Sequence, residues 1–404
     1  MSSVISRVAS GRVSTVTNTR NVRFSDHALL VSIVALALFG AVMIASASTA
    51  VSQSTHQTPF YFVIRQLIFL AIGCCIGAVV FRIPLSVWEK YGPHLIIISM
   101  LGLVLVLVPF IGKEVNGSRR WIDLGFFTIQ VSETVKLFII VYLAGYLVRR
   151  GHLVQTTFGG FARPLLLISL ACALLLLEPD FGAAVVIAST ATLMLFVAGV
   201  RFSQFVSLIA VLGAVGTFLI MLSPYRLRRF VSFMDPFEDA FDSGYQLTNS
   251  LIAIGSGGIT GVGFGNSIQK MEFLPEAHTD FLFAVLSEEL GLIGAVATIS
   301  LYVFIVWRCF CLSRKADEQG NRFAGFVALG IGIWIGLQSF INMGVCLGVL
   351  PTKGITLPLM SYGGSSAIVF AIAFSLLLRV EWELAQDERI ALRAGDSLAE
   401  EAYP

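Results

Sequence analysis

The sequence predicts an all-α, polytopic membrane protein with ten transmembrane helices, and three observations support this fold class. Hydrophobic residues make up 56% of the 404 residues and charged residues only 13%, with a mean hydropathy of +0.85. A soluble domain has a much larger charged share. Ten apolar stretches come close to the roughly 20 residues that a helix needs to cross the hydrocarbon. The loops between them are short except for one polar segment at 224–279.

The ten stretches define the expected domain organisation. We expect spans at 28–49, 60–82, 93–111, 132–149, 164–178, 181–200, 203–223, 280–308, 323–349 and 360–380. A tight corner, Glu178-Pro179-Asp180, separates the fifth span from the sixth. The chain then divides into an N-terminal tail (1–27), a ten-helix membrane domain (28–380) and a charged C-terminal tail (381–404). The long loop, 224–279, joins the seventh span to the eighth.

Basic residues orient the chain, because cytoplasmic loops carry an excess of lysine and arginine. Most of the 27 lie in the two tails and in the loops on the same side. We therefore expect both termini in the cytoplasm and the long loop outside. The exceptions on the outer side cluster in three segments and are Lys113, Arg119, Arg120, Arg226, Arg228, Arg229, Lys270 and Lys353. The cluster favours a phosphate or pyrophosphate partner, and the alternatives are pairing with nearby carboxylates or with lipid headgroups.

The residues just before the eighth span are the strongest candidates for chemistry. Glu276, His278 and Asp280 immediately precede an apolar run. A carboxylate at the edge of a bilayer is costly to hold there and usually has a function. We expect Asp280 to be the catalytic residue, acting as a general base. Lys270 and His278 are candidate substrate-binding residues beside it.

Two further charged residues lie within the fourth span. Glu133 and Lys136 are three residues apart, so they share one face of a helix. One interpretation is an internal ion pair that neutralises itself. The other is a charged patch that faces a cavity, with Lys136 on a phosphate and Glu133 orienting it. Both residues are therefore kept as catalytic candidates.

Two glycine-rich passages flank the outer side. The first, at 255–267, contains GxGxG, but no βαβ pattern surrounds it, which excludes a dinucleotide fold. The second, at 350–368, places Ser365 and Ser366 where the last span starts. Free amides and hydroxyls at a helix start can bind an anion, although a re-entrant turn with a helix cap explains the same pattern.

Several other classes of chemistry lack their signatures. No HxxxH, HExxH or Cys/His spacing is present, so no protein-bound zinc is expected. The serine pair has no histidine partner in a recognisable motif, which argues against a serine nucleophile. The net charge of +2 argues against nucleic acid. Acid–base chemistry by a carboxylate remains, with a divalent cation (Mg²⁺ or Mn²⁺) held loosely on phosphate as a possible cofactor.

Five sequence blocks also resemble a known family. They are VNGSRRWIDLGFFTIQVSETVKL (115–137), EPDFGAAVVI (178–187), YRLRRFVSFMDPFEDAFDSGYQLTNSLIAIGSGG (225–258), GVGFGNSIQKMEFLPEAHTDFLFAVLSEELG (261–291) and INMGVCLGVLPTKGITLPLMSYGGSS (341–366). In this order they resemble the SEDS proteins (shape, elongation, division and sporulation), the ten-span bacterial peptidoglycan polymerases. The run GNSIQK before FLPEAHTDF is more similar to cell-division members than to elongation members.

The resemblance implies the SEDS fold and polymerisation of lipid II on the outer face of the bacterial cytoplasmic (inner) membrane, at the division septum. Asp280 would take the proton from the 4-hydroxyl of the acceptor sugar, whose oxygen attacks C1 of the growing strand with inversion. Undecaprenyl pyrophosphate would leave, with Arg119, Arg120, Lys136 or a divalent cation stabilising its charge. A lipid II flippase and a non-catalytic divisome scaffold are the alternatives.

The resemblance also implies partners and marks two departures from the family pattern. The implied partners are lipid II, membrane lipid, an FtsI-type class B penicillin-binding protein, the FtsQ-FtsL-FtsB complex and FtsN. Val131 stands where the family usually has proline, which presets only the first helical turn. Cys346 stands where the family commonly has asparagine. A ligand contact by that amide would be missing in this chain.

Overall fold

The computed structural model describes residues 27–115, 118–123, 125, 128–271 and 273–402. Within that part, each predicted span overlaps one long helix. These helices are α2 (His27–Ala47), α4 (Tyr61–Arg82), α5 (Leu85–Leu107), α6 (Val131–Thr156), α7 (Phe158–Leu177), α8 (Phe181–Val197), α9 (Phe202–Met221), α12 (Leu282–Glu318), α13 (Arg322–Cys346) and α14 (Gly364–Ala402). The expected N-terminal tail lies outside the described residues except for His27.

The polytopic membrane fold is confirmed. Eight of these helices are long and apolar enough to cross a membrane. The apolar helix α8 has 17 residues, and α14 joins an apolar first half to a charged second half. The count of ten spans therefore stays a prediction. Helices α6 and α13 are the most deeply buried, whereas α9 buries none of its side chains and packs against α8 and α10 (Pro224–Met234).

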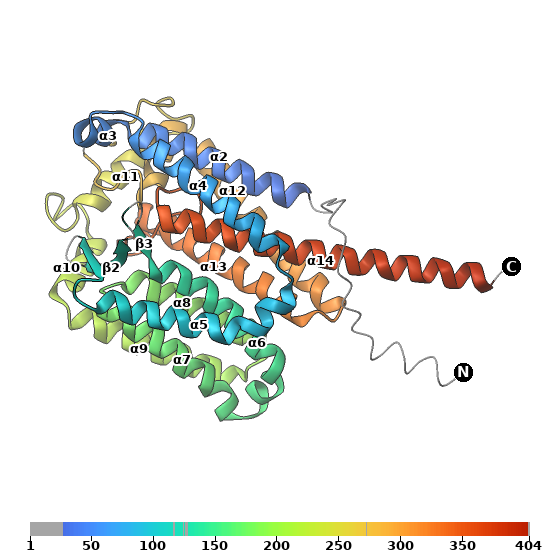
Figure 1. The fold of residues 1–404 in the computed structure, drawn as a ribbon. Helices are drawn as coiled ribbons and strands as arrows, with labels where there is room; N and C mark the ends of the chain where they lie inside the picture. The colour runs from blue at the N-terminus through green and yellow to red at the C-terminus, as the bar shows by residue number, and fades with distance from the viewer. Residues whose placement is uncertain (1–26, 116–117, 124, 126–127, 272, 403–404) are drawn as a thin grey trace.

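The helices run between two ends of the molecule (Figure 1). At one, which we call the termini end, α2 begins and α14 ends. The other, the loop end, carries the short helix α3 (Thr49–His56), α10, α11 (Tyr245–Gly257) and a small sheet. The predicted long loop, 224–279, thus contains two helices and lies at the opposite end from the termini.

Two boundaries differ from the predicted ones. Helix α5 starts at Leu85 rather than 93 and contains Pro93, because the polar run before the proline is part of the helix. Helix α14 continues to Ala402 through the segment expected to be a separate tail. An Arg379–Glu383 pair at 2.7 Å and a Lys315–Glu388 pair at 2.6 Å support this continuation, the second by joining it to α12.

A three-stranded antiparallel sheet at the loop end was not predicted. Its strands, β1 (Gly112–Val115), β2 (Ser118–Asp123) and β3 (Thr128–Gln130), pair in sequence order. Strand β3 runs directly into α6. The Ser365 hydroxyl joins the start of α14 to β3: it accepts from the Gln130 amide and donates to the Thr128 carbonyl, both at 2.9 Å. This contact fixes the sheet against the helix bundle. Strand β2 also contributes an arginine, Arg120, to the candidate functional site.

Candidate functional site

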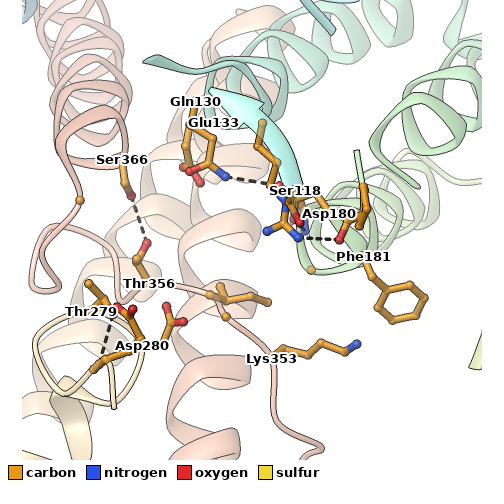
Figure 2. Close-up of a pocket in the computed structure, with 18 of the residues that line it drawn as sticks. Ser118, Gln130, Glu133, Asp180, Phe181, Thr279, Asp280, Lys353, Thr356 and Ser366 are labelled. Carbon is orange, nitrogen blue, oxygen red and sulfur yellow. Dashed lines mark hydrogen bonds between the residues drawn. The ribbon is translucent and has the colours of Figure 1, made fainter. Parts of the chain in front are cut away.

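A polar cavity of about 1060 Å³ opens among the loop-end elements. Its walls come from α4, β2, β3, α6, the corner between α7 and α8, α10, the start of α11, the segment before α12, residues 352–356 and the start of α14. Figure 2 shows Thr279 and Asp280 on one side of the cavity and Asp180 and Phe181 on the other. Segments more than two hundred residues apart in sequence therefore meet around one space.

Asp280 lies in the cavity wall, two residues before α12. Its backbone carbonyl accepts from the Asn342 amide at 2.7 Å and from the Cys346 thiol at 3.7 Å, both on α13. Burial and then Glu276 raise the pKa of its carboxyl while Arg229 and Arg120 oppose the rise, and the net result is a pKa of about 7. A base with a pKa near neutrality is well matched to proton transfer at physiological pH.

The two departures from the family pattern lie behind the site rather than in it. The Cys346 side chain is buried against the Asp280 main chain and does not line the cavity. Val131 begins α6 with regular helical geometry, so proline is not needed there. The ligand contact that an asparagine at 346 would have offered is therefore not expected at this position.

Gly354 fixes where the Asp280 carboxylate can lie. A Cβ at residue 354 would come within 2.8 Å of Asp280 Oδ2, which is closer than such atoms pack. Nearby, the Thr356 and Ser366 hydroxyls are 3.2 Å apart and both line the cavity (Figure 2). The segment before α14 therefore packs closely against the Asp280 carboxylate.

Glu133 and Lys136 form an ion pair at 2.8 Å, with side chains 8% and 4% exposed. The Lys136 ammonium also donates to Gln338 Oε1 at 2.9 Å and lies 5.5 Å from the centre of the Trp334 ring. Both members of the pair line the cavity. The two interpretations are therefore compatible: the pair is internal, and it faces the space where a ligand would bind.

Cations outnumber carboxylates on the cavity wall. The cations are Arg65, Arg120, Lys136, Arg226, Arg229 and Lys353, and the carboxylates are Glu133, Asp180, Glu276 and Asp280. Burial, together with the three neighbouring arginines, lowers the pKa of Lys353 to about 8. An anion in the cavity would relieve this repulsion. The charge pattern is that of a site for phosphate oxygens.

Arg119 and Arg120 have different environments although they are adjacent. Arg120 lines the cavity and donates to the carbonyls of Glu178 and Pro179 at 3.1 and 2.7 Å. Arg119 pairs with Glu114 at 3.0 Å on the exposed sheet, outside the cavity. Successive side chains of a strand point to opposite faces, so only one of two neighbouring arginines on β2 can face the site.

Lys270 and His278, both predicted to bind substrate, lie outside the cavity. Lys270 is 4% exposed and donates to Glu289, Ser46 and the Gly265 carbonyl. The His278 ring packs on Phe62, with ring centres 4.4 Å apart. Burial lowers the pKa of His278, which keeps its imidazole neutral. Proximity to Asp280 in sequence therefore does not place either side chain on the cavity wall.

The predicted serines reach the site in two ways. Ser365 and Ser366 both line the cavity. The Ser365 hydroxyl is already engaged with β3, whereas Ser366 faces Thr356. Ser365 therefore links the start of α14 to β3 rather than capping its own helix, and Ser366 is the freer of the two hydroxyls for a ligand.

The structure adds polar residues that the sequence did not single out. Asp180 lines the cavity, caps α8 by accepting from the Ala183 amide at 3.1 Å, and accepts from Ser132 at 3.0 Å. Glu178 is fully buried behind Arg120, and neither carboxylate oxygen has a hydrogen-bond partner among the described residues. Burial raises the pKa of Glu178 to about 8. Asp180 and Glu178 both lie in the charged corner between two apolar spans, and this corner was the sequence feature that could have identified them.

Metal ligation by protein side chains finds no support within the described ranges. No group of three or more His, Cys, Asp or Glu side chains there could hold a metal ion. A divalent cation held mainly through substrate phosphates does not need such a cluster. That cofactor stays a prediction.

The sequence relationships agree with this architecture. The model of a cell cycle protein family that covers FtsW, RodA and SpoVE matches residues 27–386. Since the match covers most of the chain, the chain belongs to this family, the SEDS proteins. Proteins named probable peptidoglycan glycosyltransferase FtsW are similar to it. One from Coxiella burnetii is 49% identical over 89% of this chain and 96% of its own. One from Nitrosococcus halophilus is 52% identical over 89% and 92%.

Solved structures support the same fold. A chain from the structure described as "structural coordination of polymerization and crosslinking by a peptidoglycan synthase complex" superposes with a TM-score of 0.75 at 28% identity. The superposition covers 91% of this chain and 100% of that one. The rod shape determining protein RodA of Thermus thermophilus gives a TM-score of 0.66 at 28% identity over 89% and 97%. The expected SEDS fold is thus confirmed.

Proposed function

We propose that this protein is a peptidoglycan glycosyltransferase that polymerises lipid II into glycan strands for septal wall synthesis. The observation that carries the proposal is Asp280, a carboxyl with a pKa of about 7 in a large cavity whose other charges are mainly cationic. A base and an anion-binding surface in one space are what glycosyl transfer from a pyrophosphate donor requires. The names of the FtsW relatives support the same activity.

In the proposed reaction the Asp280 carboxylate accepts the proton of the acceptor 4-hydroxyl. The acceptor oxygen then forms a bond to C1 of the growing strand as the bond from C1 to the phosphate oxygen breaks, with inversion at C1. Undecaprenyl pyrophosphate leaves with the bonding electrons. General base catalysis contributes about 10²–10⁴-fold, so stabilisation of the leaving group must supply much of the remainder.

We assign the cavity cations to separate roles in this reaction. Arg120, Arg226, Arg229 and Lys353 lie on the wall with no carboxylate pair among the described contacts, so we assign them to pyrophosphate. Lys136 is already paired with Glu133 and Gln338; Glu133 orients it towards the ligand. Ser366 is a neutral donor to the same group.

The protein would act in the inner membrane with both termini cytoplasmic and the loop end outside. We propose a class B penicillin-binding protein of the FtsI type as partner. The similarity to a chain in a synthase complex that couples polymerization to crosslinking supports this choice. The FtsQ-FtsL-FtsB complex and FtsN remain further proposed partners at the division septum.

A lipid II flippase is the second candidate, because a polar cavity inside a helix bundle also suits transport. A product assay separates the two. Purified protein, with and without a cognate class B penicillin-binding protein, is given fluorescent lipid II in detergent and the products are resolved on a gel. A glycan ladder supports the polymerase. Lipid II that binds but stays monomeric in both arms contradicts it and leaves transport or scaffolding.

A further inference from the structure

Helix α12 is interrupted close to the proposed base. At Gly291 φ is 65° and ψ is −161°, a left-handed conformation that favours glycine. A Cβ there would lie 2.3 Å from the Gly261 amide nitrogen, so the close approach also requires glycine. The break separates a short rod, 282–290, from the long rod 292–318. Asp280 lies two residues before the short rod, so the position of this rod influences the position of the base.

The glycine-rich backbone at 258–263 supplies the hydrogen bonds that the break removes. In a regular helix, Leu292 and Ile293 would donate to the carbonyls four residues earlier. Instead their amides donate to this segment at 2.9 and 3.2 Å. The carbonyls of Glu288 and Glu289 accept from the same segment at 3.0 and 3.1 Å. The glycines thus support the interrupted helix and do not line the cavity.

A buried ion pair reinforces this contact from the short rod. The Glu289 side chain is 0% exposed and accepts from the Lys270 ammonium at 2.7 Å and from the Ser46 hydroxyl of α2 at 2.5 Å. Lys270 also donates to Ser46 at 2.8 Å and to the Gly265 carbonyl at 2.7 Å. With three hydrogen bonds and almost no exposure, this ammonium has no donor left for a substrate.

The neighbouring carboxylate makes a second set of contacts with the same loop. Glu288 is 1% exposed and accepts from the Ser267 hydroxyl and from the Ile268 amide, the latter at 2.9 Å. We use the name clamp for Lys270, Glu288 and Glu289 together with the two serines, Ser46 and Ser267. The clamp joins α2, the loop and the short rod in one buried network.

We propose that the clamp positions Asp280 for catalysis, so that Lys270, Glu288 and Glu289 are positioning residues of the transferase. This inference rests on the proposed role of Asp280 as the base. Glu289 is nine residues from Asp280, about 13 Å at 1.5 Å per residue, so it cannot touch the reacting atoms. A base displaced by about 1 Å can lose on the order of 10²-fold in rate, and a loosened short rod would allow such a displacement.

Glu289→Gln tests the proposal in the full-length protein with its class B penicillin-binding protein present. We expect kcat for lipid II polymerisation to fall by about 10–100-fold while KM changes less than about threefold. Hydrogen exchange over 282–290 should become faster in the absence of substrate. Glu388→Gln is the matched control, because it breaks a lysine pair at the other end of α12. We expect it to change neither measurement.

The milder Ser46→Ala variant covers the case in which Glu289→Gln does not fold. It removes one hydroxyl from the clamp and leaves the ion pair, and we expect a fall in kcat of about 3–10-fold at unchanged KM. An unchanged kcat in a folded clamp variant overturns the proposal. So does a tenfold rise in KM at constant kcat, which would make the clamp part of a binding site. Asp280→Asn, measured alongside, separates the two hypotheses: if it stays active, the proposed base is wrong whatever the clamp does.

Discussion

Asp280, the proposed general base, is held in surroundings that oppose its ionisation. Protein atoms replace most of its water, Glu276 adds a second negative charge nearby, and Arg229 and Arg120 compensate only in part. Its raised pKa gives the carboxylate more basicity than a solvated aspartate has. The same surroundings make its charge costly to the folded protein, so activity and stability should depend on pH in opposite ways.

This opposition yields a pH prediction. Because only the carboxylate accepts a proton, kcat/KM of the wild type should rise with pH through an apparent pKa near 7 and level off above it. The folded-state pKa lies above 3.8, the ordinary value for a solvated aspartate. The stability that protonated Asp280 provides is therefore complete below about pH 4 and lost as pH rises through 7.

Asp280→Asn cannot ionise, so its melting temperature should exceed that of the wild type at pH 8, by at least about 2 °C. The difference should shrink towards pH 5. Thermal unfolding in detergent at several pH values measures it. An equal or lower melting temperature of the variant at pH 8 would contradict the raised pKa.

Gly354 allows a separate test of where the carboxylate lies. A methyl group at this position would press on Asp280 Oδ2 at 2.8 Å and push it out of place. We expect Gly354→Ala to lower kcat by about 10²-fold with a small change in KM. Gly213→Ala is the control, since nothing lies within 4 Å of its added Cβ. Equal kcat values for the two variants would mean that the carboxylate tolerates displacement.

The two adjacent arginines of β2 give a paired prediction. Arg120→Gln removes a cation from the cavity wall, so KM for lipid II should rise by about tenfold or more, in line with a lost charge-assisted hydrogen bond. Arg119→Gln removes an exposed pair with Glu114, which is worth little, and KM should change less than about twofold. Steady-state polymerisation kinetics compare them. If both substitutions raised KM equally, ligand contact would not depend on which face of β2 a side chain occupies.

At the scale of elements, hydropathy predicted the helices because lipid imposes a simple length and composition on every span. The sheet was not predicted, because its strands are short and polar. Asn116-Gly117 before β2 is a strong hairpin signal. The long apolar segments dominated the prediction, so this signal was not used. Once β2 is known, the alternation of side chains explains why Arg120 and not Arg119 reaches the cavity.

The site was predictable only where local sequence determined it. Asp280 and the Glu133–Lys136 pair were found because a charge beside or inside an apolar run is conspicuous. The buried position of Lys270 outside the cavity was not predicted, because its partners, Ser46 and Glu289, are distant in sequence and only the folded chain brings them together. The break at Gly291 was not predicted for the same reason, because its contacts with the segment 258–263 form only in the folded chain.

At the scale of the whole molecule, the two ends of the bundle define the proposed topology. Phe241 is 97% exposed at the loop end, and Gln319 lies in the turn after α12 at the termini end. In cells, we expect a membrane-impermeant maleimide to label Phe241→Cys directly and Gln319→Cys only after the inner membrane is permeabilised. The reverse pattern would invert the orientation and place Asp280 on the cytoplasmic side.

The proposed mechanism depends on Asp280 acting as the base within a folded, substrate-binding protein. The most direct measurement is the lipid II polymerisation rate of Asp280→Asn, with lipid II binding and thermal unfolding recorded on the same preparation. We predict a loss of at least about 10²-fold in rate with binding and folding retained. A variant that keeps more than about a tenth of the wild-type rate would contradict general base catalysis by Asp280.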